Sequence, residues 1–223
     1  MSTVRVHFQE ELRALERDVA KLGSFVESMI AEAMRALVEQ DTALADEVIR
    51  KDDIADDLDL AIEQAAMRLL ALQQPMAKDL RLIGTALKVI ADLERIGDYA
   101  VDIARAAQIL SNEPFFKPLE DLPRMAAIAQ AMLRDVLRAF VQRDLELVAK
   151  VCEDDDLVDQ LWYKLLDELM GVMRRSPDLV RQATYLLLVA RYLERVADHT
   201  TNVAERVNYV ETGVLKQLVP ACH

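Results

Sequence analysis

Apolar residues recur along the first half of the chain at the three- and four-residue spacing of an amphipathic helix. One such run extends from near Val6 to Leu37, a second covers about 42–73, and a third covers about 77–110. The polar stretch Gln40-Asp41-Thr42 separates the first two runs. Pro75 ends the second run, because proline disfavours helix at the residue before it. The pattern predicts three long helices.

The second half of the chain repeats this pattern. Helical spacing covers about 124–142, then continues to about Arg175, and runs again from Pro177 to Glu211 before Thr212-Gly213. Asp144 precedes the fifth helix as Asp41 precedes the second, and both suit an N-cap. Short connections make neighbouring helices antiparallel. We therefore expect an all-α fold of two tandem three-helix bundles, with six long antiparallel helices over 1–112 and 124–213, a linker at 113–123 and a tail at 214–223.

Composition and charge exclude several classes of function. The chain has 223 residues, of which 52% are hydrophobic, with only 5 glycines and 6 prolines, and this favours long helices. A net charge of −12 argues against binding to nucleic acid. The longest clean apolar run, Tyr185 to Ala190, is too short to span a bilayer, and the N-terminus lacks a signal-peptide core. We expect a cytoplasmic protein that reaches the membrane only through partners.

A carboxylate motif occurs once in each half, as Leu93-Glu-Arg-Ile-Gly-Asp98 and, 100 positions later, as Leu193-Glu-Arg-Val-Ala-Asp198. In each copy the glutamate and the aspartate are four residues apart and share one helix face. In the first copy, the pair interrupts an apolar stripe that includes Ile90 and Val101. The motif therefore places two acids on a face that is otherwise suited to packing.

The preceding helix of each half carries a second pair of acids at the same depth. Asp56 and Glu94 each lie 19 residues from the turn at Pro75, and Asp52 and Asp98 each lie 23 from it. In the second half, with the turn at Ser176, the matching pairs are Asp159 with Glu194 and Asp155 with Asp198. Residues at equal distance from a helical turn lie at almost the same height on adjacent helices. Each bundle is therefore expected to gather four carboxylates.

Four carboxylates held together repel one another unless a cation neutralises them. Oxygen-only ligand sets suit hard or borderline cations such as Mg²⁺, Mn²⁺ or iron. The pattern predicts one metal site in each bundle, with the ligands Asp52, Asp56, Glu94, Asp98, Asp155, Asp159, Glu194 and Asp198. A competing interpretation stays open at this point: Arg95 and Arg195 can form ordinary surface ion pairs with these acids. His199 follows Asp198 but is not expected to supplement the metal site, because its counterpart in the first half is Tyr99. Trp162 is better assigned to packing than to cofactor binding.

The segment Gln74-Pro-Met-Ala-Lys-Asp-Leu-Arg81, taken together with the two Leu-Glu-Arg motifs, resembles the PhoU family of phosphate-uptake regulators. The resemblance covers nearly the whole chain. It implies two three-helix bundles related by pseudo-twofold symmetry, in a protein that is not an enzyme. It also implies metal clusters, iron first with Mn, Mg or Zn as alternatives, on the eight carboxylates named above. The Gln-Pro-x-Ala segment has no copy in the second half, and Gly97 becomes Ala197, so the two sites can differ.

The family resemblance further implies partners and a mode of action. The expected role is negative regulation of phosphate uptake and of the phosphate-starvation response. The expected partners are a phosphate-responsive sensor histidine kinase and the ATPase subunit of a phosphate ABC transporter, and a homodimer is expected. Two alternatives remain: a carboxylate-bridged di-metal oxidase, for which the usual Glu-x-x-His pairs are missing from the sequence, and a metal-free helical scaffold.

Overall fold

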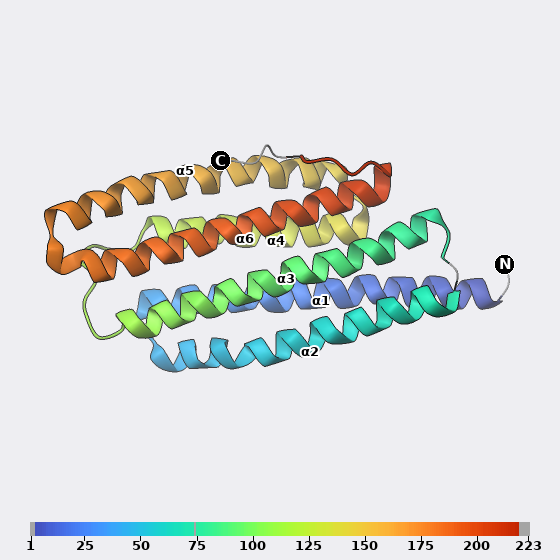
Figure 1. Ribbon diagram of the computed structural model, residues 1–223, viewed down its shortest axis with the longest axis horizontal. Coiled ribbons are helices and arrows are strands. Elements are labelled where there is room, and N and C mark those ends of the chain that lie inside the picture. The colour runs from blue at the N-terminus through green and yellow to red at the C-terminus, as the bar shows by residue number, and fades with distance from the viewer. Residues whose placement is uncertain (1–2, 74, 219–223) are drawn as a thin grey trace.

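The computed structural model describes residues 3–73 and 75–218, and Gln74 and the end of the tail lie outside them. The described ranges form six α-helices and one 3₁₀ turn, without strands (Figure 1). The helices are α1 (Thr3–Glu39), α2 (Thr42–Gln73), α3 (Ala77–Leu110), α4 (Asp121–Gln142), α5 (Leu145–Arg175) and α6 (Val180–Thr212), and the 3₁₀ turn η1 is Pro177–Leu179. None of these helices is long and apolar enough to cross a membrane.

The helices form two three-helix bundles, as the sequence predicts. In the first bundle α1, α2 and α3 contact one another, and in the second bundle α4, α5 and α6 do the same. The bundles join where α1 meets α4 and where α3 meets α6. The helices α2 and α5 contact only their own bundles, and in Figure 1 they lie on opposite sides of the molecule.

The turns that open α2 and α5 are built alike. Asp41 Oδ1 accepts a hydrogen bond from the backbone N–H of Leu44 at 3.0 Å. Asp144 Oδ1 accepts one from the backbone N–H of Leu147 at 3.2 Å. The residues just before them, Gln40 and Arg143, both have left-handed backbones, with φ of 55° and 62°. The predicted N-caps are therefore confirmed, and the internal repeat extends to the turn geometry.

The structure shortens the predicted linker, because α4 begins at Asp121 and not near residue 124. Pro123 lies in the first turn of α4, where its missing N–H has no intrahelical acceptor to lose. Buried Gln182 of α6 fixes the rest of the linker. Its Oε1 accepts from the backbone N–H of Phe116 at 2.9 Å, and its Nε2 donates to the carbonyl of Pro114 at 3.0 Å.

Candidate functional site

In the first bundle the acids of α2 and α3 meet in two hollows. Asp56 and Glu94 line a hollow of about 370 Å³, and Asp52 and Asp98 line a hollow of about 320 Å³. These are the two partner pairs that equal depth along the hairpin predicts. We call the four residues the first acidic site.

The charges of the first acidic site act on one another. Burial raises the pKa of Glu94 above its ordinary value, and the charges of Asp98 and Asp56 raise it further, while Arg95 lowers it. Burial also raises the pKa of Asp52, followed by the charges of Asp56 and Asp98. The carboxylates of α2 and α3 are therefore close enough to oppose one another's ionisation.

The corresponding acids of α5 and α6 are more deeply buried. Asp155 is 5% exposed and Glu194 is 8% exposed. Burial, with the charges of Asp159 and Asp198 next, raises the pKa of Asp155 to about 7. Burial, with the charge of Asp198 next, raises the pKa of Glu194 to about 7 as well. We call Asp155, Asp159, Glu194 and Asp198 the second acidic site.

The arginine of each motif forms the ion pair that the competing interpretation expects. Nη1 of Arg95 lies 3.0 Å from Oδ2 of Asp98, and Nη1 of Arg195 lies 3.0 Å from Oδ2 of Asp198. Both arginines are exposed, so each pair stabilises the fold only slightly.

These ion pairs do not account for the acids on α2 and α5. Within the described part of the chain, four of them make no hydrogen bond or ion pair of their own: Asp52, Asp56, Asp155 and Asp159. The motif arginines therefore explain half of each site, and among the other four acids Asp52 has a nearby cation in Arg105, whose charge lowers its pKa.

The donor chemistry of both sites fits a hard or borderline cation, since every predicted ligand offers carboxylate oxygen. One oxygen of the second site, Oε2 of Glu194, is buried without a hydrogen-bond partner. Such an atom is unfavourable unless something binds it. In residues 3–73 and 75–218, however, no three His, Cys, Asp or Glu side chains already converge on one point as metal ligands. The residues offer the oxygen donors and the burial that suit a bound cation. Their side chains would have to turn toward one another to hold it.

Two further acids line the hollow of Asp56 and Glu94, and they were not among the ligands predicted from the sequence. Asp59 and Glu63 of α2 line it beside Asp56, and Oδ1 of Asp59 is buried without a hydrogen-bond partner. Their spacing of three and seven residues from Asp56 places them on the same helix face, and this signal was available in the sequence.

His199, which follows Asp198, contacts the opposite bundle. Its Nδ1 lies 2.8 Å from Oδ1 of Asp92 on α3, and its ring lies against Tyr99. These contacts place His199 at the boundary between the two bundles.

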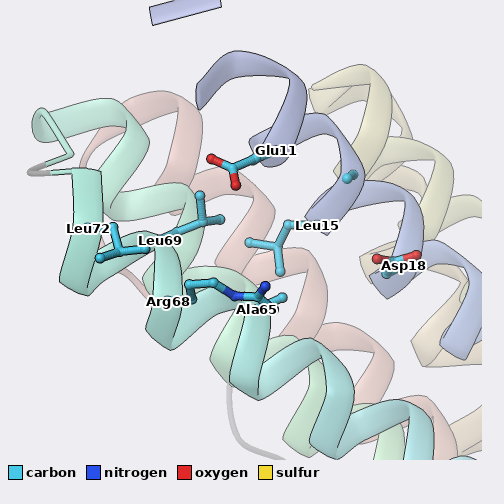
Figure 2. A pocket seen from close by; sticks show the side chains of 8 residues that line it. Glu11, Leu15, Asp18, Ala65, Arg68, Leu69 and Leu72 are labelled. Carbon is cyan, nitrogen blue, oxygen red and sulfur yellow. The ribbon is translucent and has the colours of Figure 1, made fainter. Parts of the chain in front are cut away.

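A separate pocket lies between α1 and α2, away from both acidic sites. Figure 2 shows residues of both helices that line it, among them Glu11, Leu15 and Asp18 of α1 and Arg68, Leu69 and Leu72 of α2. Its volume is about 150 Å³, and its lining mixes leucines with both signs of charge. None of the eight predicted ligands lines it.

Comparison with known proteins gives one consistent family. The family model described as the PhoU domain matches residues 19–107 and again residues 122–207, once in each bundle. A phosphate-specific transport system accessory protein PhoU homolog from Clostridium acetobutylicum is 41% identical, over 92% of this chain and 94% of that protein. The homolog from Aquifex aeolicus is also 41% identical, over 83% and 84% of the two chains.

Solved structures agree with this assignment. The crystal structure of the phosphate transport system regulatory protein PhoU from Streptococcus pneumoniae superposes with a TM-score of 0.89 at 34% identity. It covers 95% of this chain and 100% of that one. PhoU from Pseudomonas aeruginosa gives a TM-score of 0.88 at 33% identity, over 93% and 100%. The two carboxylate motifs, the repeated bundles and these matches together show that the chain belongs to the PhoU family.

Proposed function

We propose that this protein is a cytoplasmic accessory regulator of phosphate transport, which restrains phosphate uptake and the phosphate-starvation response. Membership of the PhoU family supports the role, because relatives that match over nearly their whole length are named as accessory or regulatory proteins of phosphate transport. The protein acts by binding and not by turnover. Its proposed partners are the ATPase subunit of the phosphate ABC transporter and the phosphate-responsive sensor kinase, and the proposed assembly is a homodimer.

The proposal includes one cation site in each bundle. The observation that carries it is buried Glu194, whose Oε2 has no hydrogen-bond partner and which lies in the field of Asp198 and Asp159. The first acidic site and the second acidic site would each hold a cation, with iron first and Mn, Mg or Zn as alternatives. When bound, the cation supplies positive charge that offsets the repulsion among the four carboxylates. The neutralised helices α2 and α5 then offer surfaces of altered charge on opposite sides of the molecule.

A deletion strain tests the regulatory role. We expect loss of the protein to derepress phosphate-starvation genes in phosphate-replete medium, and the wild-type gene should restore repression. Normal repression in the deletion strain would contradict the role. A pull-down from the same cells, with the tagged wild-type protein as bait, should retain the transporter ATPase and the sensor kinase. Recovery of neither would contradict the adaptor mechanism.

Replacing all eight site carboxylates with amides tests whether regulation depends on cation binding at the acidic sites. If cation binding shapes the docking surfaces, a strain with this variant should resemble the deletion strain although the variant is folded and expressed. Full repression by the folded variant would show that regulation does not depend on the acidic sites.

A further inference from the structure

Arg191 of α6 is held against the second acidic site by two groups at once. Its guanidinium carbon lies 5.6 Å from the centroid of the Trp162 ring on α5. Its Nη1 also donates a hydrogen bond to Oε1 of Glu194, one turn further along α6. A guanidinium over an indole face is attracted by the negative face of the ring. The second site therefore contains a positive charge supplied by the protein itself.

The first bundle has different residues at the equivalent positions. Ala91 stands 100 positions before Arg191, and Asp59 stands 103 positions before Trp162, in the same registers as the acidic motifs. Ala91 and Asp59 both line the hollow beside Glu94. The hollow beside Glu94 is therefore lined by an aspartate and an alanine at the positions where the second site has an aromatic ring and an arginine.

Arg191 satisfies only part of Glu194. The hydrogen bond from Arg191 reaches Oε1, whereas Oε2 is buried and has no partner among the described residues. Glu194 as a whole is 8% exposed, so water reaches it poorly. A buried carboxylate oxygen without a partner is unfavourable. This oxygen is suited to a second cationic group besides Arg191.

We propose that Arg191 is a displaceable counter-cation of the second acidic site, which leaves Glu194 and Trp162 when a divalent cation binds there. The inference rests on the cation binding proposed above and adds its regulation. Two positive groups beside one carboxylate repel each other, so the metal ion and the guanidinium compete. The second site is then the weaker of the two. Its filling also changes the surface of α5 around Trp162, so that occupancy becomes visible to a partner.

The single tryptophan of the chain gives a direct test, because its emission reports on this position alone. The parent protein is a full-length variant whose first acidic site is disabled by the four substitutions Asp52→Asn, Asp56→Asn, Glu94→Gln and Asp98→Asn. It is titrated with Zn²⁺ and with Mg²⁺, two closed-shell ions, while tryptophan emission and the heat of binding are followed. We expect emission and heat to change with the same midpoint, as Arg191 leaves the indole face.

The Arg191→Ala variant of this parent shows whether the emission change comes from displacement of Arg191 or only from a cation bound near Trp162. Its cation-free emission should already resemble that of the loaded parent, and added cation should no longer change it. Its second-site affinity should rise by about tenfold or more, because the competing charge has gone. Arg191→Met keeps the apolar stem on the indole ring, and should behave in the same way if alanine lowers stability.

A matched control lies on the same helix. Arg181 is held 5.9 Å from the centroid of the Tyr185 ring, and its Nη1 lies 3.3 Å from Oε1 of Glu113. Arg181→Ala removes an arginine with the same kind of contacts, away from the acidic sites, and should leave emission and affinity as in the parent.

Two results would overturn the inference while leaving cation binding in place. One is binding heat in the parent without a change in tryptophan emission. The other is an emission response and an affinity that are the same in Arg191→Ala as in the parent. An absence of binding heat with either ion, in both the parent and Arg191→Ala, would contradict cation binding at the second site and the inference with it.

Discussion

Nδ1 of His199 on α6 lies 2.8 Å from Oδ1 of Asp92 on α3, across the boundary between the two bundles. A second contact on the same boundary stacks the ring of Tyr99 on that of Tyr192, with centroids 5.9 Å apart. Positions 92 and 192 are equivalent in the repeat, as are 99 and 199. The pseudo-twofold axis therefore relates the two contacts to each other. The contact between Asp92 and His199 is polar, and its equivalent between Tyr192 and Tyr99 is aromatic.

Asp92→Ala is expected to weaken the contact between the bundles. The substitution leaves the half-buried His199 without its acceptor, and removes the acceptor of Asn202 at 3.3 Å as well. We expect the free energy of unfolding to fall by about 1–3 kcal/mol, measured by urea denaturation. The control is Asp102→Ala, whose exposed pair with Arg105 should contribute about 0.5 kcal/mol or less. Equal losses in the two variants would contradict this account of the boundary.

Two glycines should respond in opposite directions to alanine. A Cβ at Gly23 of α1 would lie 2.5 Å from Cδ1 of buried Leu137 on α4, so Gly23→Ala overpacks the contact between the bundles. We expect a loss of about 1–3 kcal/mol, partly recovered when Leu137→Ala is added. Gly84 has no atom within 4 Å of such a Cβ, so Gly84→Ala should stabilise α3 by up to about 1 kcal/mol. Thermal unfolding of the three variants checks both signs.

The second acidic site should make the metal-free protein less stable as pH rises. Burial raises the pKa of Asp155 and of Glu194 to about 7, from ordinary values of 3.8 and 4.5. A group with a raised pKa in the folded state contributes stability that is complete below its unfolded pKa and is lost as pH rises through its folded pKa. The urea midpoint of metal-free protein should therefore fall as pH rises from about 4 to about 8, most steeply between about pH 5 and 6 and little above the folded-state pKa of about 7.

The double variant Asp155→Asn, Glu194→Gln should flatten this pH profile. With a saturating divalent cation present, the urea midpoint should instead be higher at the higher pH, because carboxylate ligands bind metal in their deprotonated form. The equivalent variant of the first site, Asp52→Asn with Glu94→Gln, should flatten the profile less, since these acids are more exposed. A profile that is unchanged in the second-site variant would show that these two acids do not control it.

The helices could be predicted closely from the sequence because their ends carry local signals. The bounds of α2 and α3 match the apolar spacing and the turn residues, and Asp41 and Asp144 cap the helices that follow them. The start of α4 was predicted too late, because Pro123 suggests a break and yet is tolerated in a first helical turn. Local patterns do not show which of these two roles a proline has.

Only the part of each acidic site that follows from helical geometry could be predicted from the sequence. Equal depth along a hairpin brings Asp56 to Glu94 in one hollow, and the structure has this pairing. The contacts of Arg191 depend on which face of α6 meets α5, and on a ring that lies far away in the sequence. They are tertiary features, and only the folded chain shows that an arginine and an aromatic ring lie beside Glu194 where an alanine and an aspartate lie beside Glu94.

The most direct measurement is isothermal titration of the wild-type protein with Mn²⁺ or Fe²⁺ under anaerobic conditions. The account predicts two classes of site. Amide substitution of the first acidic site should remove the tighter class, substitution of the second should remove the weaker class, and substitution of all eight carboxylates should remove both. Binding heat that is the same in the eight-amide variant as in the wild type would contradict the assignment of these carboxylates as cation ligands.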